Sequence, residues 1–224
     1  AAWSLCGTAM RLVGRVAFPL FAFMIAEGAV HTRDRRWYAL RLLLLAVISE
    51  IPFDLVAGGT WLFPADQNTV FTLLLGLLAV WAGDLICGTG SGVSYGNREK
   101  TGDGGRKAVG QRRFPLEYER YIRVLAAVPF GLAAYCLKTD YGFMGVLLIV
   151  ILYTLRTEPQ LRTAVCAVFL FCMYMDFYGA AACVAIFLIN RYNGEKGGGN
   201  GRIFYLFYPL HLLVIWGIKM AVGL

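Results

Sequence analysis

Six ionisable side chains interrupt the long apolar segments of this 224-residue sequence, and they are the first candidates for chemistry. Apolar segments of about 15–20 residues have the length needed to cross a bilayer. A charged side chain inside such a segment costs about 2.5–3.5 kcal/mol on insertion scales, so it usually marks a functional site or a buried pair. The six residues are Arg15, Glu27, Glu50, Asp54, Asp84 and His211.

His211 is the sharpest of these candidates because it lies within the apolar run FYPLHLLVIW, one helical turn after Tyr208. Imidazole titrates near neutral pH and can take and return a proton, so His211 suits a general base. Tyr208 could orient this base or donate a hydrogen bond to a reacting oxygen. The structural alternative is that His211 makes one interhelical hydrogen bond and takes no part in chemistry.

Glu50 and Asp54 are four residues apart, with Pro52 between them, and we expect them to act with His211 and Tyr208 as catalytic residues. A proline inside a helix removes a backbone hydrogen bond, and the freed carbonyl needs another partner. Arg15 could instead form a buried ion pair with one of these acids. Asp84 lies near the end of its segment, and we expect its carboxylate to reach the membrane surface.

A basic cluster follows the first apolar segment and consists of Arg33, Arg35, Arg36 and, further on, Arg41. Glu27 and His31 are four residues apart just before it, so they share one helical face. Guanidinium groups at a membrane surface could hold the phosphates of a nucleotide-like ligand or of anionic lipids. The alternative is a solvated charged face without a ligand.

Eight apolar segments must position these residues. The sequence is 58% apolar and only 16% charged, whereas soluble domains are about a quarter charged. Only helices or closed barrels cross lipid, and barrel strands would alternate in polarity, so we predict an all-α, polytopic integral membrane helical bundle with about eight transmembrane helices. The spans are predicted at residues 11–30, 39–56, 69–87, 122–138, 141–156, 161–175, 177–190 and 203–222, with 161–190 as one bent element in an alternative reading.

Basic residues alternate between the connections of this predicted bundle. Of the 21 Lys and Arg residues, 17 fall in four regions that would lie on one side, and the other four are Arg11, Arg15, Lys138 and Lys219. Loops rich in Lys and Arg stay in the cytoplasm. We therefore expect the basic loops to be cytoplasmic and both termini of this sequence to lie outside.

We expect residues 1–224 to form a single transmembrane domain with a flexible, glycine-rich, basic cytoplasmic loop at residues 88–118. Its GDGGRK segment lacks the spacing of a phosphate-binding loop. The net charge of +7 comes from loops between apolar segments, so we expect no nucleic-acid partner. The six cysteines have no CxxC spacing, and we expect no metal.

Four segments together resemble the TraX family of membrane proteins. They are residues 11–55 (RLVGRVAFPLFAF onward), NTVFTLLLGLLA at 68–79, TDYGFMGVLLIVILY at 139–153 and FYLFYPLHLLVI at 204–215. The resemblance implies a multi-helix acetyltransferase of a bacterial inner membrane, because the founding member is linked to N-terminal acetylation of conjugative pilin. Family members typically carry a further upstream helix with an Asp-His pair, and we expect this sequence to lack it.

On this reading the donor is cytosolic acetyl-CoA, bound through Arg33, Arg35, Arg36 and Arg41. The acceptor would be an amine or hydroxyl of a peptide, sugar or lipid. Its binding residues are expected to be Arg15, Glu27, His31, Asn68 and Asp140, which match the family pattern. Membrane lipids are the other expected partners, and the sequence does not indicate an oligomeric state. The alternatives are an ion- or proton-coupled transporter and a non-enzymatic membrane assembly factor.

Overall fold

The computed structural model describes residues 2–63, 65–89, 113–174, 177–194 and 201–222. These residues form eight α-helices and no strand beyond one isolated bridge between Gln67 and Thr139. The helices are α1 (Ala2–His31), α2 (Arg35–Ala57), α3 (Thr69–Cys87), α4 (Leu116–Cys136), α5 (Gly142–Thr154), α6 (Pro159–Tyr174), α7 (Phe177–Asn190) and α8 (Gly201–Val222). The predicted all-α class is therefore confirmed for this part of the chain.

The helices differ from the predicted spans mainly at their ends. Helix α1 begins at Ala2 and α4 at Leu116, so both start before the apolar segments at 11 and 122. Residues 161–190 form two helices, α6 and α7, rather than one bent element. Most of the predicted glycine-rich loop, residues 90–112, lies outside the described residues.

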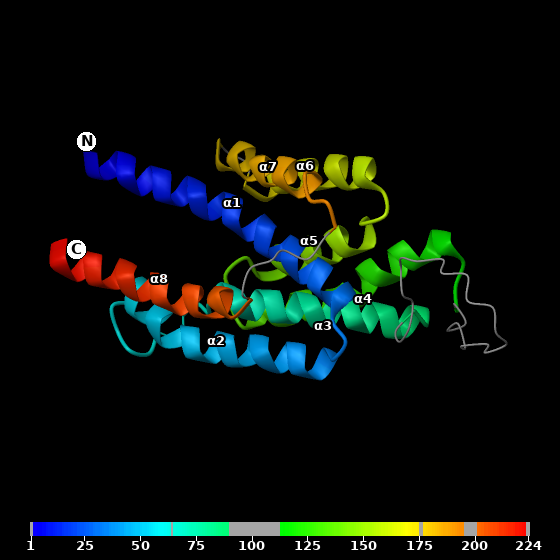
Figure 1. Ribbon diagram of the computed structural model, residues 1–224, viewed down its shortest axis with the longest axis horizontal. Coiled ribbons are helices and arrows are strands. Elements are labelled where there is room, and N and C mark those ends of the chain that lie inside the picture. The colour runs from blue at the N-terminus through cyan, green and yellow to red at the C-terminus, as the bar shows by residue number, and fades with distance from the viewer. Residues whose placement is uncertain (1, 64, 90–112, 175–176, 195–200, 223–224) are drawn as a thin grey trace.

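Successive helices run in opposite directions along the long axis of the molecule (Figure 1). The turns from α1 to α2 and from α5 to α6 lie at one end, together with the C-terminus of α3 and the N-terminus of α4. The connections at this end contain Arg33 between α1 and α2, Arg113 just before α4, and Arg156 between α5 and α6, and we call it the basic end. The α2–α3 and α4–α5 connections lie at the opposite end, so the alternation of charge in the sequence corresponds to two ends of one bundle.

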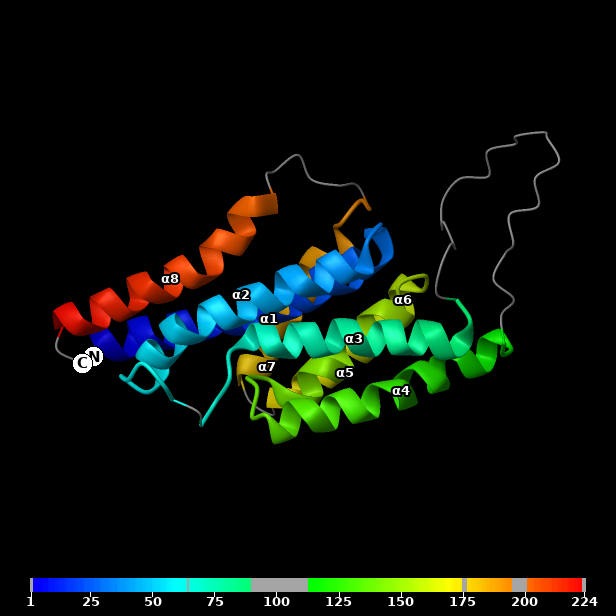
Figure 2. The same cartoon turned by 90° about the horizontal axis from the view of Figure 1, so that it is seen from below.

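The core lies where α3 and α5 pack against each other and against α1. Phe18, Leu77, Val146 and Ile149 are almost completely buried there. Gly76 faces Ile149 so closely that an added Cβ atom would overlap the isoleucine side chain. Helix α8 lies along α2, as Figure 2 shows from below, and Lys219 near its end donates a hydrogen bond to the carbonyl of Val56.

The outer face of helix α2 is apolar, although the helix also buries polar residues. Polar residues of α2 such as Ser49 and Asp54 are buried, whereas its outer face exposes a continuous set of large apolar side chains. These are Leu40, Leu43, Leu44, Val47, Ile48 and Ile51. Among the described residues, one helix, Thr69–Cys87, is both long and apolar enough to cross a membrane by length and composition.

Candidate functional site

Glu50 of α2 and Asn68 at the start of α3 form the centre of a polar cluster inside the bundle. Asn68 is the N-cap of α3, since its side chain accepts a hydrogen bond from the backbone N–H of Val70 at 2.9 Å. Its side-chain amide donates to the carbonyl of Ala46 at 2.8 Å and to Oε2 of Glu50. The backbone N–H of Asn68 donates to the same Glu50 oxygen at 3.3 Å.

Asp140 joins this cluster from the connection between α4 and α5. Its carboxylate accepts a 2.7 Å hydrogen bond from the hydroxyl of Thr69, the first residue of α3. The flanking Lys138 and Tyr141 adopt left-handed backbone conformations with φ of 52° and 66°. Such strain in non-glycine residues is concentrated at functional sites. The neighbouring protein raises the pKa of Asp140 through desolvation, while the bond from Thr69 and the charge of Arg15 act in the opposite direction.

Arg15 approaches the cluster from α1 and lies against tyrosines rather than against Glu50 or Asp54. Its guanidinium carbon is 4.6 Å from the centre of the Tyr174 ring. The hydroxyl of Tyr141 is also near this guanidinium, and the Tyr141 ring stacks on Phe18 with a centroid distance of 3.6 Å. A cation over an aromatic ring is stabilised by the ring quadrupole, so Arg15 is held in place between α5 and α6.

The hydroxyl of Tyr208 in α8 lies within hydrogen-bonding distance of Thr69 and interacts electrostatically with the carboxylates of Glu50 and Asp140. His211 follows one turn later, with its ring 5.3 Å from the Tyr208 ring and 5.2 Å from that of Phe207. Nδ1 of His211 is 3.1 Å from the carbonyl oxygen of Phe207. In the tautomer with its proton on Nδ1, this contact is a hydrogen bond, and the lone pair of Nε2 stays available to accept a proton.

Two carboxylate oxygens in this region have no hydrogen-bond partner although they are buried. They are Oε1 of Glu50 and Oδ1 of Asp54. The other oxygen of Asp54 accepts a 3.0 Å bond from the backbone N–H of Phe63. Most buried polar atoms in proteins are paired, so an unpaired carboxylate oxygen requires an explanation in function or in strain. We call Glu50, Asp54, Asn68, Thr69, Asp140 and Tyr208 the Glu50 cluster.

A second buried cluster lies at the basic end and is built around Asp84 of α3. Arg35 donates to one oxygen of Asp84 at 2.9 Å, and Arg123 of α4 donates to the other at 2.5 Å. The hydroxyl of Tyr153 in α5 is 3.0 Å from both oxygens, and Thr89 is 3.3 Å from one of them. We call these five residues the Asp84 cluster.

The prediction that Asp84 would reach the membrane surface was wrong, because only 1% of this residue is exposed. Its charge is compensated inside the bundle by two guanidinium groups from different helices. Arg35, which was predicted to hold donor phosphates, is one of these partners. Arg33 and Arg36 are exposed beside it, and Arg41 lies over the ring of Tyr38.

Glu27 and His31 lie at the basic end of α1 and therefore far from the Glu50 cluster. Nδ1 of His31 is 2.9 Å from the carbonyl oxygen of Glu27 and 3.8 Å from its carboxylate. The structure thus brings Arg15, Asn68 and Asp140 together but separates them from these two predicted acceptor-binding residues. Within the described residues, no group of three or more His, Cys, Asp or Glu side chains has the arrangement of a metal site.

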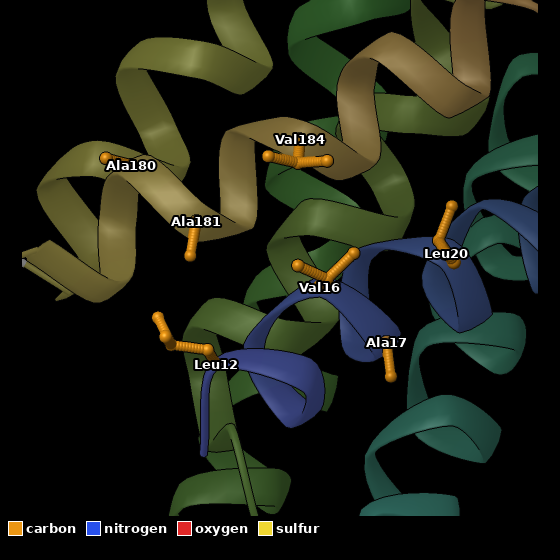
Figure 3. Close-up of a pocket in the computed structure, with 7 residues that line it drawn as sticks. All are labelled: Leu12, Val16, Ala17, Leu20, Ala180, Ala181 and Val184. Atoms are coloured by element: carbon orange, nitrogen blue, oxygen red, sulfur yellow. The ribbon is translucent and has the colours of Figure 1, made fainter. Parts of the chain in front are cut away.

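An open apolar pocket lies between α1 and α7 (Figure 3). It is lined by Leu12, Val16, Ala17, Leu20, Ala180, Ala181 and Val184. None of these side chains carries a polar group. The pocket lining therefore supplies no group that could act as an acid, a base or a nucleophile.

Comparison with known protein families shows to which family this chain belongs. The sequence model of the family described as TraX protein matches residues 2–89 and 113–219, which include every residue of both clusters. The chain belongs to the TraX family. The resemblance seen in the four sequence segments is thereby confirmed, and the TraX match leaves out residues 90–112 within the predicted basic loop.

A curated relative of this TraX-family chain carries the name probable fimbrial assembly protein FimC, serogroup H1, and comes from Dichelobacter nodosus. The two sequences are 26% identical over 235 residues, which cover 94% of this chain and 83% of the relative. No solved structure matches the chain.

Sequence reasoning missed several residues that the two clusters of this TraX-family chain contain. Thr69 follows Asn68 directly, but its hydroxyl gave no signal because threonine is common at helix starts. Arg123 and Tyr153 were not considered as partners of Asp84. A buried aspartate requires compensation, and a search for cations at the same end of neighbouring helices would have found Arg123.

Proposed function

We propose that this chain is an integral membrane acetyltransferase that transfers the acetyl group of cytosolic acetyl-CoA to an amine or hydroxyl acceptor. The observation that carries the proposal is the Glu50 cluster. There, buried carboxylates with unpaired oxygens lie beside Tyr208, and His211 follows on the same helix. Groups that take and return protons are what acyl transfer between a thioester and an amine or alcohol needs.

The exposed apolar face of α2 supports a location in a membrane. Lipid favours apolar side chains on the outside, so an exposed face such as Leu43, Val47 and Ile51 is stable there. Exposed aromatic residues also lie at both ends, with Trp37, Tyr118 and Tyr121 at the basic end and Trp61 and Tyr135 at the other. Tryptophan and tyrosine are enriched at the two membrane–water interfaces. We therefore assign the basic end to the cytoplasmic side of a bacterial inner membrane.

At the basic end, exposed Arg33 and Arg36 would attract the phosphates of acetyl-CoA, with Arg41 further along α2. Arg35 supports this surface from within, since its guanidinium is fixed by Asp84. Guanidinium groups bind phosphate oxygens through paired N–H donors. The thioester would then extend between the helices toward His211.

His211 acts as the general base in this scheme. Nε2 removes a proton from the acceptor nitrogen or oxygen as that atom attacks the thioester carbonyl, and the hydroxyl of Tyr208 donates to the developing oxyanion. The tetrahedral intermediate collapses with cleavage of the carbon–sulfur bond, and the leaving thiolate takes the proton back from His211. The products are an acetylated acceptor and CoA, and no other reactant is consumed.

The acceptor side is assigned to the Glu50 cluster and Arg15, at the end away from the basic loops. The curated relative is named for fimbrial assembly, and this name favours a fimbrial or pilin-like subunit as acceptor. The terminal amine of such a peptide would be held by the carboxylates of Glu50, Asp54 and Asp140. Sugar and lipid acceptors are tested alongside it.

Binding of the donor is the first test. The purified protein in detergent is heated with and without acetyl-CoA, and saturable stabilisation against a CoA-free control is expected. Transfer of a deuterated acetyl group to peptide, sugar and lipid acceptors is then followed by mass spectrometry. His211→Ala should reduce transfer by about 100-fold or more while it preserves donor binding.

The matched control is His31→Ala, since the chain contains two histidines and His31 is the last residue of α1, at the basic end of the bundle. This variant should keep the turnover rate within about twofold. Full activity of His211→Ala would remove the histidine from the mechanism. Absence of any donor-dependent stabilisation or transfer in the wild-type protein would refute the enzyme and favour the non-enzymatic assembly factor.

A further inference from the structure

Asn68 has used all of its hydrogen-bond donors inside the protein. The residue is completely buried. One amide N–H donates to the carbonyl of Ala46 and the other to Oε2 of Glu50, while the side-chain oxygen accepts from the backbone N–H of Val70. An amide side chain has two N–H donors, so Asn68 has none left for a substrate.

The same contacts divide the two oxygens of Glu50 into different environments. Oε2 receives the side-chain amide and the backbone N–H of Asn68, two donors from one residue. Oε1 is buried and receives none. Two fixed donors on one oxygen hold the carboxylate plane in a single orientation and leave the lone pairs of Oε1 unused.

We infer that Asn68 is a positioning residue that clamps Oε2 of Glu50, so that Oε1 alone is presented to the acceptor. This inference rests on the proposed acetyl transfer and gives Asn68 a role different from direct contact with the acceptor. The clamp also couples the orientation of Glu50 to the start of α3, because Asn68 is the N-cap of that helix. Thr69, the next residue, holds Asp140 in the same way from its hydroxyl.

Asn68→Ser separates the two roles of this side chain, which are to cap α3 and to clamp Glu50. Serine is a favourable N-cap and can still accept a hydrogen bond from the N–H of Val70. It has no side-chain amide to donate to Glu50. Asn68→Ala removes the cap as well as the clamp and reports the cost of losing both. Asn190→Ser, an equivalent change at the end of α7 and outside the Glu50 cluster, is the matched control.

Steady-state kinetics then distinguish positioning from substrate binding. Asn68→Ser is expected to lower kcat by about 10–100-fold, because a misoriented Glu50 misplaces the acceptor amine, and small misplacements of a reacting group have effects of this size. The KM for acetyl-CoA should remain within about twofold of wild type, and Asn190→Ser should leave both parameters unchanged. A wild-type kcat in Asn68→Ser, or a raised acceptor KM with unchanged kcat, would overturn the inference.

Thermal unfolding of the same proteins tests the clamp without any assay of transfer. Asn68→Ser, Glu50→Ala and the double variant form a cycle, and residues in direct contact give non-additive effects. We expect the double variant to lose less in Tm than the sum of the two single losses. Additive losses overturn the clamp whatever the kinetics show. Coupling in Tm, together with a wild-type protein that transfers no acetyl group, would instead retain the clamp and refute the proposed function.

Discussion

The two polar clusters lie at opposite ends of the same pair of helices, α2 and α3, and differ in how completely their carboxylates are hydrogen-bonded. Asp84 is surrounded by donors, and both of its oxygens are hydrogen-bonded to the side chains of other helices. In the Glu50 cluster, Glu50 and Asp54 each keep one buried oxygen without a partner. About 22 Å of α3 separates Thr69 from Asp84, so the clusters are independent sites.

This difference separates a structural role from a chemical one. A buried carboxylate with all its bonds made fixes the relative positions of the helices that supply the donors, here α2, α4 and α5 around α3. A carboxylate with an unpaired oxygen has capacity left for a ligand or a proton. Mutations in the Asp84 cluster should therefore lower the stability of the protein, and mutations in the Glu50 cluster should lower its activity.

The largest effect is expected from Asp84→Asn. Loss of the carboxylate leaves Arg35 and Arg123 with uncompensated positive charges, and removal of one partner from a buried ion pair costs about 3–5 kcal/mol. Thermal unfolding in detergent measures this loss. Asp66→Asn changes an exposed aspartate at the other end and should leave Tm nearly unchanged. Equal Tm values for the two variants would contradict the structural role of Asp84.

Glu50→Gln should show the opposite behaviour. Glutamine has the same shape and can still accept a bond from Asn68, so Tm should change little. Loss of the carboxylate that holds the acceptor amine should lower acetyl transfer by about 100-fold. Transfer is measured by mass spectrometry and Tm by thermal unfolding on the same preparation. A fall in Tm as large as that of Asp84→Asn, with activity retained, would reverse the assignment of the two clusters.

The sequence predicted the helices and their alternation because hydropathy and charge are local properties of each segment. It also singled out Glu50, Asn68, Asp140 and Tyr208, which the structure brings into one cluster. It failed for Asp84, because the partners of this carboxylate come from α2, α4 and α5 and are found only when the ends of neighbouring helices are compared. The hydrogen bonds from Asn68 to Glu50 could not be predicted either, because they depend on how α2 packs against the start of α3.

The basic end offers an intermediate effect that separates donor binding from structure. Arg33 and Arg36 are exposed and Arg35 is paired with Asp84. Replacing Arg33 and Arg36 together by Ala should raise the KM for acetyl-CoA by about tenfold with Tm unchanged, as expected for lost phosphate contacts. Arg35→Ala should lower Tm instead. Unchanged KM in the double variant would remove this surface from the donor site.

The smallest effect is expected from Tyr153→Phe, which removes one hydroxyl from the Asp84 cluster and leaves the ring in place. The hydroxyl donates to a carboxylate that two guanidinium groups already neutralise, so its loss should cost only about 1 kcal/mol. Tyr121→Phe removes an exposed hydroxyl from α4 and should not change Tm. Acetyl transfer should be the same in both variants. If Tyr153→Phe lowered transfer without a change in Tm, the Asp84 cluster would have a chemical role, and complete hydrogen bonding would no longer distinguish the two clusters.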